Sequence, residues 1–173
     1  MTPPESVDAS ARRTLSQRWR SPAVITAWIA VVVCISLVLW AGSEAFSVTS
    51  TSRFLRPLLI YLFPEWTTRQ LWNAEVWIRK TAHAVEYAVL ALLAFRALRL
   101  SFDTILARLA AGALLLVLTV ATVDEVRQGF LSMRTGAPSD VVLDCTGALL
   151  AVGMAVLYRW RKESVRRAGR AET

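Results

Sequence analysis

The chain is a series of long apolar runs separated by short polar segments. Four of these runs cover residues 22–42, 81–98, 105–123 and 141–158. An α-helix of about 20 residues is long enough to cross the roughly 30 Å hydrocarbon core of a bilayer. We therefore predict an all-α membrane protein that forms a bundle of four transmembrane helices.

The segments between the runs add detail to this bundle. Ser101 and Asp103 lie in a tight connection between the second and third runs, which favours antiparallel neighbours. Residues 57–63 (PLLIYLF) are apolar but too short to cross, and tryptophans follow them. Because tryptophan concentrates at headgroup depth, we expect a short amphipathic or re-entrant segment in this first outer loop. The fourth run carries small residues that allow close helix packing in lipid: Gly147, Ala148, Ala151, Gly153 and Ala155.

Basic residues indicate the orientation. They cluster before the first run, between the second and third, and after the fourth: Arg12, Arg13, Arg18 and Arg20; Arg96, Arg99 and Arg108; Arg159, Arg161, Lys162, Arg166, Arg167 and Arg170. Loops rich in Lys and Arg stay in the cytoplasm, so both termini are expected there. Residues 1–21 and 159–173 would then be basic cytoplasmic tails without fixed structure, on either side of a membrane domain of residues 22–158.

Composition agrees with a membrane protein. Hydrophobic residues make up 55% of the chain and charged residues 19%, with a net charge of +7. The Arg and Lys residues flank apolar runs and do not line a polar face, so no nucleic-acid partner is expected. The first run exceeds the roughly 7–15 apolar residues of a signal peptide and is expected to stay uncleaved. Cys34 and Cys145 lie in apolar runs without metal or redox spacing, which predicts buried free thiols.

The most informative polar residues gather at the outer ends of the last three runs. They lie at the start of the second run, the end of the third, the loop after it and the start of the fourth: His83, Glu86 and Tyr87; Asp124, Glu125 and Gln128; Arg134; Asp140 and Asp144. An ionisable group at membrane depth costs about 2.5–3.5 kcal/mol on insertion scales, so such groups usually face one another or a cavity. One interpretation is a shared outer site. The other is a set of helix caps and ion pairs, with Ser139 or Asp140 as a cap and Arg127 or Arg134 as a counter-charge.

In chain order these residues form spaced blocks. The blocks are Arg79-Lys80-x-Ala82-His83-x-x-Glu86-Tyr87-x-x-Leu90, Asp124-Glu125-x-x-Gln128-x-Phe130, Arg134, and Asp140-x-x-x-Asp144-x-x-Gly147. The pattern, best matched over residues 79–153, closely resembles the VanZ-like family of bacterial membrane proteins. Ser43 at the end of the first run is similar in place to a serine of that family. The resemblance implies a multi-pass protein of the bacterial plasma membrane. It also implies a link to teicoplanin resistance, because the family takes its name from a member with that phenotype.

A binding site is the first of three functions that these residues allow. It would recognise a lipidic or lipidated ligand at the outer surface, with membrane lipids as neighbours. Basic side chains would hold acidic groups of the ligand, since Arg offers bidentate contacts to phosphate and carboxylate. The binding set would be Arg79, Lys80, Tyr87, Gln128, Arg134 and Asp140.

An enzyme and a transporter are the other two functions. The enzyme would act on a lipid-linked envelope intermediate, with His83 as general acid or base and Glu86 orienting it. The carboxylates of Asp124, Glu125 and Asp144 would polarise water or bind Mg²⁺ or Mn²⁺, because oxygen ligands suit these ions. A proton-coupled transporter or accessory subunit would use Glu86 and Asp144 and would need buried polar residues that continue to the inner face.

Overall fold

The computed structural model describes residues 18–43, 48–130 and 138–171. The helices in these ranges are α2 (Pro22–Ala41), α3 (Val48–Leu62), α4 (Thr68–Ser101), α5 (Leu106–Gly129) and α6 (Pro138–Ala171). No described residue lies in a β-strand, so the predicted all-α class is confirmed. The first run forms α2 almost as predicted, and Pro22 starts it, since proline suits the first helical turn.

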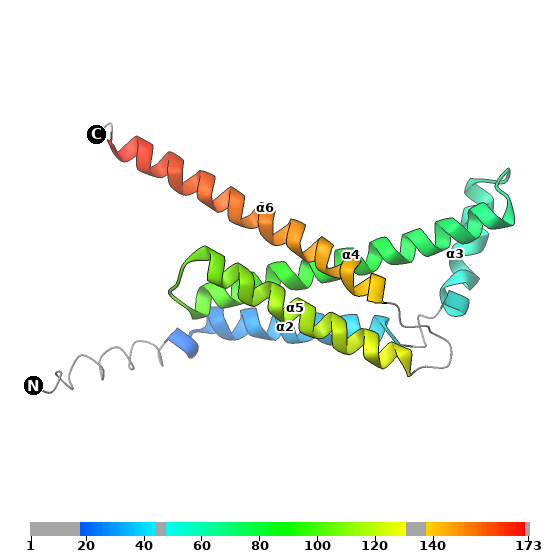
Figure 1. The fold of residues 1–173 in the computed structure, drawn as a ribbon, viewed down its shortest axis with the longest axis horizontal. Coiled ribbons are helices and arrows are strands. Elements are labelled where there is room, and N and C mark those ends of the chain that lie inside the picture. The colour runs from blue at the N-terminus through cyan, green and yellow to red at the C-terminus, as the bar shows by residue number, and fades with distance from the viewer. Residues whose placement is uncertain (1–17, 44–47, 131–137, 172–173) are drawn as a thin grey trace, which may run out of the picture.

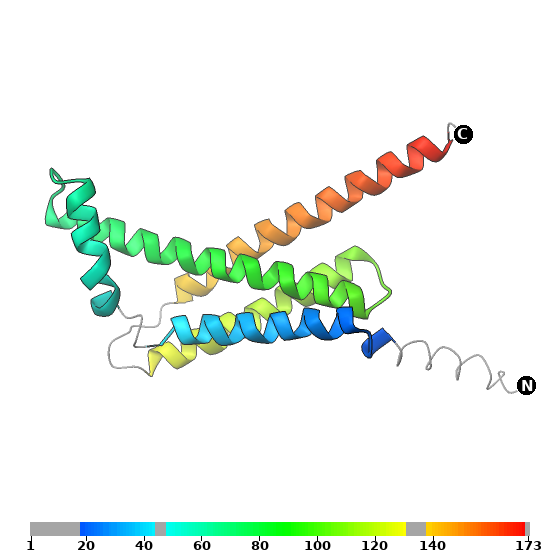
Figure 2. The ribbon, with the colours of Figure 1, turned by 180° about the vertical axis from the view of Figure 1, so that it is seen from behind.

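Successive long helices run in opposite directions, and α4 lies at the centre of the bundle (Figure 1). α4 packs against α2, α5 and α6 along the bundle and against α3 beyond it. The ends of α2 and α5 and the start of α6 lie together, and we call this the polar end (Figures 1 and 2). The start of α2, the α4–α5 connection and the end of α6 lie at the opposite end, where α6 leaves the bundle. The antiparallel arrangement expected for the second and third runs is confirmed.

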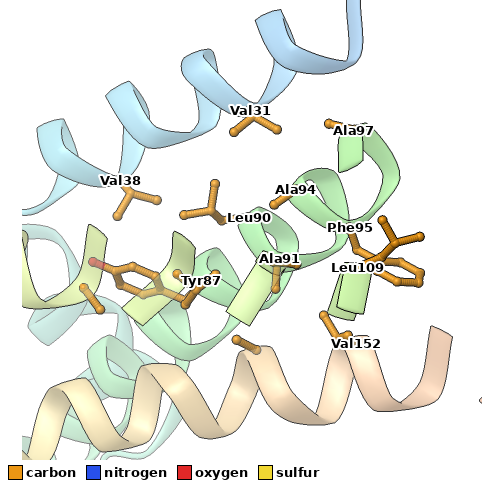
Figure 3. Close-up of a cluster of buried hydrophobic side chains, with 14 of the residues drawn as sticks. Val31, Val38, Tyr87, Leu90, Ala91, Ala94, Phe95, Ala97, Leu109 and Val152 are labelled. Carbon is orange, nitrogen blue, oxygen red and sulfur yellow. The ribbon is translucent and has the colours of Figure 1, made fainter. Parts of the chain in front are cut away.

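The bundle interior is apolar along most of its length. α5 supplies Leu109, Ala113, Val117 and Ala121, one residue in every four, so a single stripe of the helix faces inward. α4 supplies the largest share of the core, including Leu90 and the small residues Ala91, Ala94 and Ala97 that follow it (Figure 3). Tyr87 lies at the end of this core nearest Val38, and Ala97 lies at the other end (Figure 3). The core therefore ends in a tyrosine where the polar end begins.

Small residues bring α4 and α6 close together. A side chain on Gly147 would place its Cβ 2.6 Å from the Ala84 carbonyl oxygen, so glycine is needed for this contact. Ala148 and Ala151 are buried on the same helix, as the packing argument predicts. Gly153 is different, because no atom lies within 4 Å of the position of its Cβ and the residue is exposed. Only part of the small-residue run thus serves helix packing.

The short apolar segment of the first outer loop forms part of α3. This helix lies across the long axis of the bundle beside the start of α4 (Figure 1). Glu75 of α4 is 1% exposed and accepts hydrogen bonds from α3. Arg56 Nε donates to Glu75 Oε1 at 2.9 Å, and Ser52 Oγ donates to Oε2 at 2.8 Å. A buried carboxylate needs such partners, so this ion pair holds α3 against α4.

Two helices are longer than the apolar runs that predicted them. α4 begins at Thr68, 13 residues before the run, because Thr67 and Gln70 form a capping box in which each side chain accepts the other's backbone N–H. α6 continues to Ala171, so the expectation of an unstructured tail from residue 159 is wrong up to that point. This segment has no proline, and arginine, lysine, glutamate and alanine all favour helix.

The described helices fit a membrane protein. Three segments are long and apolar enough to cross a bilayer: Pro22–Ala41, Leu106–Gly129 and Ser139–Val165, with mean hydropathies of 2.6, 2.1 and 2.0. α4 is not among them, and its sequence carries His83, Glu86 and Arg96 within the apolar part. Cys34 and Cys145 are free thiols as predicted, but both are only partly buried.

Candidate functional site

Asp124 is the buried centre of the polar end. It continues the inward stripe of α5 one turn beyond Ala121, so the helix places this carboxylate inside the bundle, where it is 2% exposed. Arg127 Nη2 donates to Asp124 Oδ1 at 2.7 Å, and Gln128 Nε2 donates to Oδ2 at 2.7 Å. The Tyr87 hydroxyl lies 3.5 Å from Oδ2. Both carboxylate oxygens are therefore bonded by groups from two helices, which the burial of a charge requires.

The end of α2 completes the surroundings of Asp124. Arg127 Nη2 also donates to the carbonyl oxygen of Leu39, one of the last carbonyls of α2, which have no partner within their own helix. A Cβ on Gly42 would lie 2.6 Å from Asp124 Oδ1 and 2.8 Å from Arg127 Nη2. The backbone of Gly42 has an ordinary helical φ of −70°, so the position needs the absence of a side chain and not a special conformation. The structure thus places Gly42, and not Ser43 beside it, against the buried pair.

A second group of polar residues lines a small cavity between α4, α5 and α6. Its volume is about 20 Å³, and its walls are Lys80, His83, Glu125, Gln128, Asp140, Leu143 and Asp144. Lys80 Nζ donates to Asp140 Oδ1 at 2.6 Å, and both side chains are partly exposed. His83 and Asp144 lie about one helical turn deeper. The cavity is large enough for one water-sized group, which needs about 10–15 Å³.

Asp144 is the most enclosed group of this cavity. The residue is 6% exposed, and its Oδ1 atom is buried with no hydrogen-bond partner among the described residues. An isolated carboxylate oxygen in such a place is costly, and its neighbours on the cavity wall do not bond it. The cavity wall therefore includes a carboxylate with an unused, buried acceptor.

Glu86 lies near His83 of the cavity and on the wall of a larger apolar groove. His83 Nδ1 lies 3.7 Å from Glu86 Oε2, which is an ion-pair distance when the imidazole is protonated but is longer than a hydrogen bond. Glu86 also lines a groove of about 460 Å³ between α2 and α4. Its other walls are Cys34, Leu37, Val38, Trp40, Ala41, Val85 and Val89. A carboxylate thus lies on the wall of an otherwise apolar groove, beside the histidine of the polar cavity.

The remaining predicted binding residues are basic. Arg79 comes directly before Lys80 on α4 and is half-buried. Burial lowers the pKa of its guanidinium, and the nearby Asp140 carboxylate opposes that shift. Arg134 lies outside the described residues. The structure therefore brings the predicted residues together in two adjoining groups, one around Asp124 and one around the cavity, with Gln128 contacting both.

The comparison with known families agrees with this arrangement. The model of the family described as VanZ/LLP1 matches residues 24–159. The chain belongs to the VanZ/LLP1 family. The match covers α2 to α5 and the bundle part of α6, so it includes both polar groups and the groove. No curated protein and no solved structure matches the chain.

Two of the sequence hypotheses receive no support from the geometry of this VanZ/LLP1 protein. Among residues 18–43, 48–130 and 138–171, no three His, Cys, Asp or Glu side chains are grouped as a metal ion would need. The buried polar residues in the same ranges are Glu75, Ser101, Asp124 and Asp144. Ser101 lies at the opposite end, and the side chains buried between it and Asp144 are apolar. The polar chain to the inner face that a transporter would need is therefore missing from the described part of the bundle.

Proposed function

We propose that this VanZ/LLP1 protein is a multi-pass protein of the bacterial plasma membrane that binds a lipidic or lipidated ligand at its outer face. The acyl chain would lie in the α2–α4 groove, and the polar head would reach the cavity through Glu86 and His83. The observation that carries the proposal is the placement of one carboxylate on the wall of an apolar groove beside a polar cavity. Ligand sites commonly combine a mostly apolar lining with a few polar groups that fix orientation.

The proposal includes a fourth crossing by α4 and cytoplasmic termini. α4 lies alongside α5, which is itself long and apolar enough to cross. Only residues 102–105 join the two helices, and four extended residues reach about 14 Å, less than half the thickness of the hydrocarbon core. The connection is too short to pass back through a membrane, so α4 must lie at the same depth as α5. The distribution of basic residues supports an orientation with the polar end outside.

Topology can be tested at the two ends of α4. Thr68 is the first residue of α4, Thr104 follows the helix in the α4–α5 connection, and both are exposed. In a chain with Cys34 and Cys145 replaced by serine, we expect Thr68→Cys to react with a membrane-impermeant maleimide in intact cells. Thr104→Cys should react only after the membrane is permeabilised. Equal labelling of both cysteines in intact cells would contradict a crossing by α4.

Occupation of the groove can be tested against a matched groove on the same protein. The α5–α6 groove has a similar volume of about 420 Å³, but its walls carry no charged residue. In lipid nanodiscs we expect a photoreactive alkyl alcohol to label the α2–α4 groove roughly tenfold more than the α5–α6 groove, since hydrogen bonds to charged groups contribute about 1.5–3 kcal/mol. Cross-linked peptides identified by mass spectrometry give the ratio.

Two substitutions make this measurement specific. Val85→Trp should fill the α2–α4 groove and remove the excess label there. Leu118→Trp in the α5–α6 groove should leave the labelling of the α2–α4 groove unchanged. Equal labelling of the two grooves in the wild-type protein would mean that both only contact bulk lipid. If the groove also serves teicoplanin resistance, expression should raise the inhibitory concentration of teicoplanin, and Val85→Trp, but not Leu118→Trp, should abolish that rise.

A further inference from the structure

The charges around the cavity differ from those expected of a site for an acidic group. Three carboxylates, of Glu125, Asp140 and Asp144, line it with one ammonium, that of Lys80. With a neutral His83, the carboxylates of the lining outnumber its one ammonium. A phosphate or carboxylate on a ligand would be repelled by this excess, whereas a cation would reduce it.

Two basic side chains of the polar end, those of Lys80 and Arg127, already bond groups of the protein itself. Lys80 bonds Asp140, and Arg127 bonds both Asp124 and the Leu39 carbonyl. A ligand phosphate could use them only by breaking these contacts, one of which neutralises a buried carboxylate. Neither Lys80 nor Arg127 therefore favours recognition of a ligand phosphate.

The cavity also has a built-in acceptor and a defined size. Asp144 Oδ1 is buried without a hydrogen-bond partner and belongs to the cavity wall. Gln128 donates its amide to Asp124, so its carbonyl oxygen remains as a second acceptor on the same wall. A volume of about 20 Å³ accepts a group the size of a water molecule, and it excludes a phosphate or a trimethylammonium.

We propose that the cavity selects the primary ammonium group of an amphiphile whose chain lies in the α2–α4 groove. This inference rests on the proposed function and specifies the head group that the same site accepts. The ammonium is compact, carries three donors and is charged at neutral pH, so it supplies Asp144 with a bonded counter-charge. His83 on the cavity wall and Glu86 on the groove wall lie 3.7 Å apart, so the head and the chain of such a ligand would meet beside this pair.

The experiment measures competition against the photoreactive alcohol with three compounds of one chain length: dodecylamine, dodecyltrimethylammonium and dodecanol. We expect dodecylamine to displace the probe from the α2–α4 groove at a concentration roughly tenfold lower than the other two. Equal potency of all three would overturn the ammonium site and leave groove binding intact. Equal potency of the two cations alone would also overturn it, because general charge attraction would then suffice. Failure of the probe to prefer the groove would instead contradict the proposed function.

Variants assign the preference to the cavity. Asp144→Asn keeps the shape of the side chain and removes its charge, so the dodecylamine advantage should disappear while labelling of the groove persists. Asp103→Asn removes an exposed carboxylate at the opposite end and should leave the advantage unchanged. An unchanged advantage in Asp144→Asn would overturn the assignment. The selectivity order of the wild-type protein tests the proposal even if a variant fails to fold.

Two further competitors identify the source of the amine. Phosphatidylethanolamine presents a primary ammonium on a membrane lipid, and phosphatidylcholine with the same chains presents a trimethylammonium. Selective competition by phosphatidylethanolamine would support a membrane lipid as the ligand. Competition by dodecylamine but by neither phospholipid would support an amine on a lipidated ligand without a phosphate.

Discussion

Arg127→Met is expected to lower the free energy of unfolding by about 3–5 kcal/mol, the usual cost of leaving a buried charge without its partner. The Asp124 side chain is 2% exposed, and among its bonding partners in the described part of the chain only Arg127 is a cation. Methionine keeps the length and apolar character of the side chain but removes the charge. The loss also frees the Leu39 carbonyl at the end of α2. Circular dichroism during titration with dodecyl sulfate in mixed micelles measures the change.

A second ion pair provides the control for this substitution. Arg18 Nη2 lies 3.1 Å from Asp103 Oδ2, but the two side chains are 38% and 91% exposed. Exposed pairs contribute about 0–1 kcal/mol, so Arg18→Met should have little effect. Adding Asp124→Asn to Arg127→Met should recover part of the loss, because the buried charge is then gone as well. If Arg127→Met and Arg18→Met lowered the free energy of unfolding by similar amounts, burial of the ion pair would not determine its contribution to stability.

The sequence predicts the helices better than their ends. Apolar runs locate every long helix of the described chain because burial in lipid or in the bundle demands them. The length of an apolar run does not predict, however, how far a helix continues into polar sequence. α4 starts earlier because of the Thr67–Gln70 capping box, whose Thr-x-x-Gln pattern is visible in the sequence. α6 continues past Tyr158 because no residue there stops a helix.

Helical spacing places the candidate site residues at the polar end but does not assign their partners. The sequence indicates that His83 and Glu86 share a face, and the structure brings them to 3.7 Å. Which carboxylate pairs with which cation depends on how α4 packs among α2, α5 and α6. That packing is set by long-range contacts that no local pattern encodes. The sequence does not reveal the role of Gly42 either, because that role depends on a long-range contact. A Cβ at this position would clash with the Asp124 side chain.

The two interpretations of the polar residues each describe one part of the site. Ion pairing accounts for Asp124 with Arg127, a counter-charge that the cap-and-pair interpretation names, and for Asp140 with Lys80, a partner that it does not name. It does not account for Asp144, which lines the cavity with its Oδ1 buried and unbonded, or for the position of Glu86 on the groove. Paired residues therefore form the frame of the polar end, and the ligand proposal rests on the two carboxylates that this frame surrounds.

Gly147→Ala is expected to lower the free energy of unfolding by about 1–3 kcal/mol through overpacking. The new Cβ would lie 2.6 Å from the Ala84 carbonyl oxygen and 3.2 Å from its carbon, and a backbone cannot rotate away as a side chain can. α4 and α6 would have to separate next to His83 and Asp144. The same mixed-micelle titration measures the loss, and the dodecylamine preference should fall with it because the cavity lies between these two helices.

Gly153→Ala is the matched control, because it makes the same change on the same helix where no atom lies within 4 Å. Alanine favours helix over glycine by up to about 1 kcal/mol in water, so this variant should be neutral or slightly stabilised. Opposite outcomes at the two glycines would show that the close approach of α4 and α6, and not glycine content, holds the bundle together at the site. If both substitutions were neutral, the helices could separate without cost, and the cavity would have no fixed size with which to select a ligand.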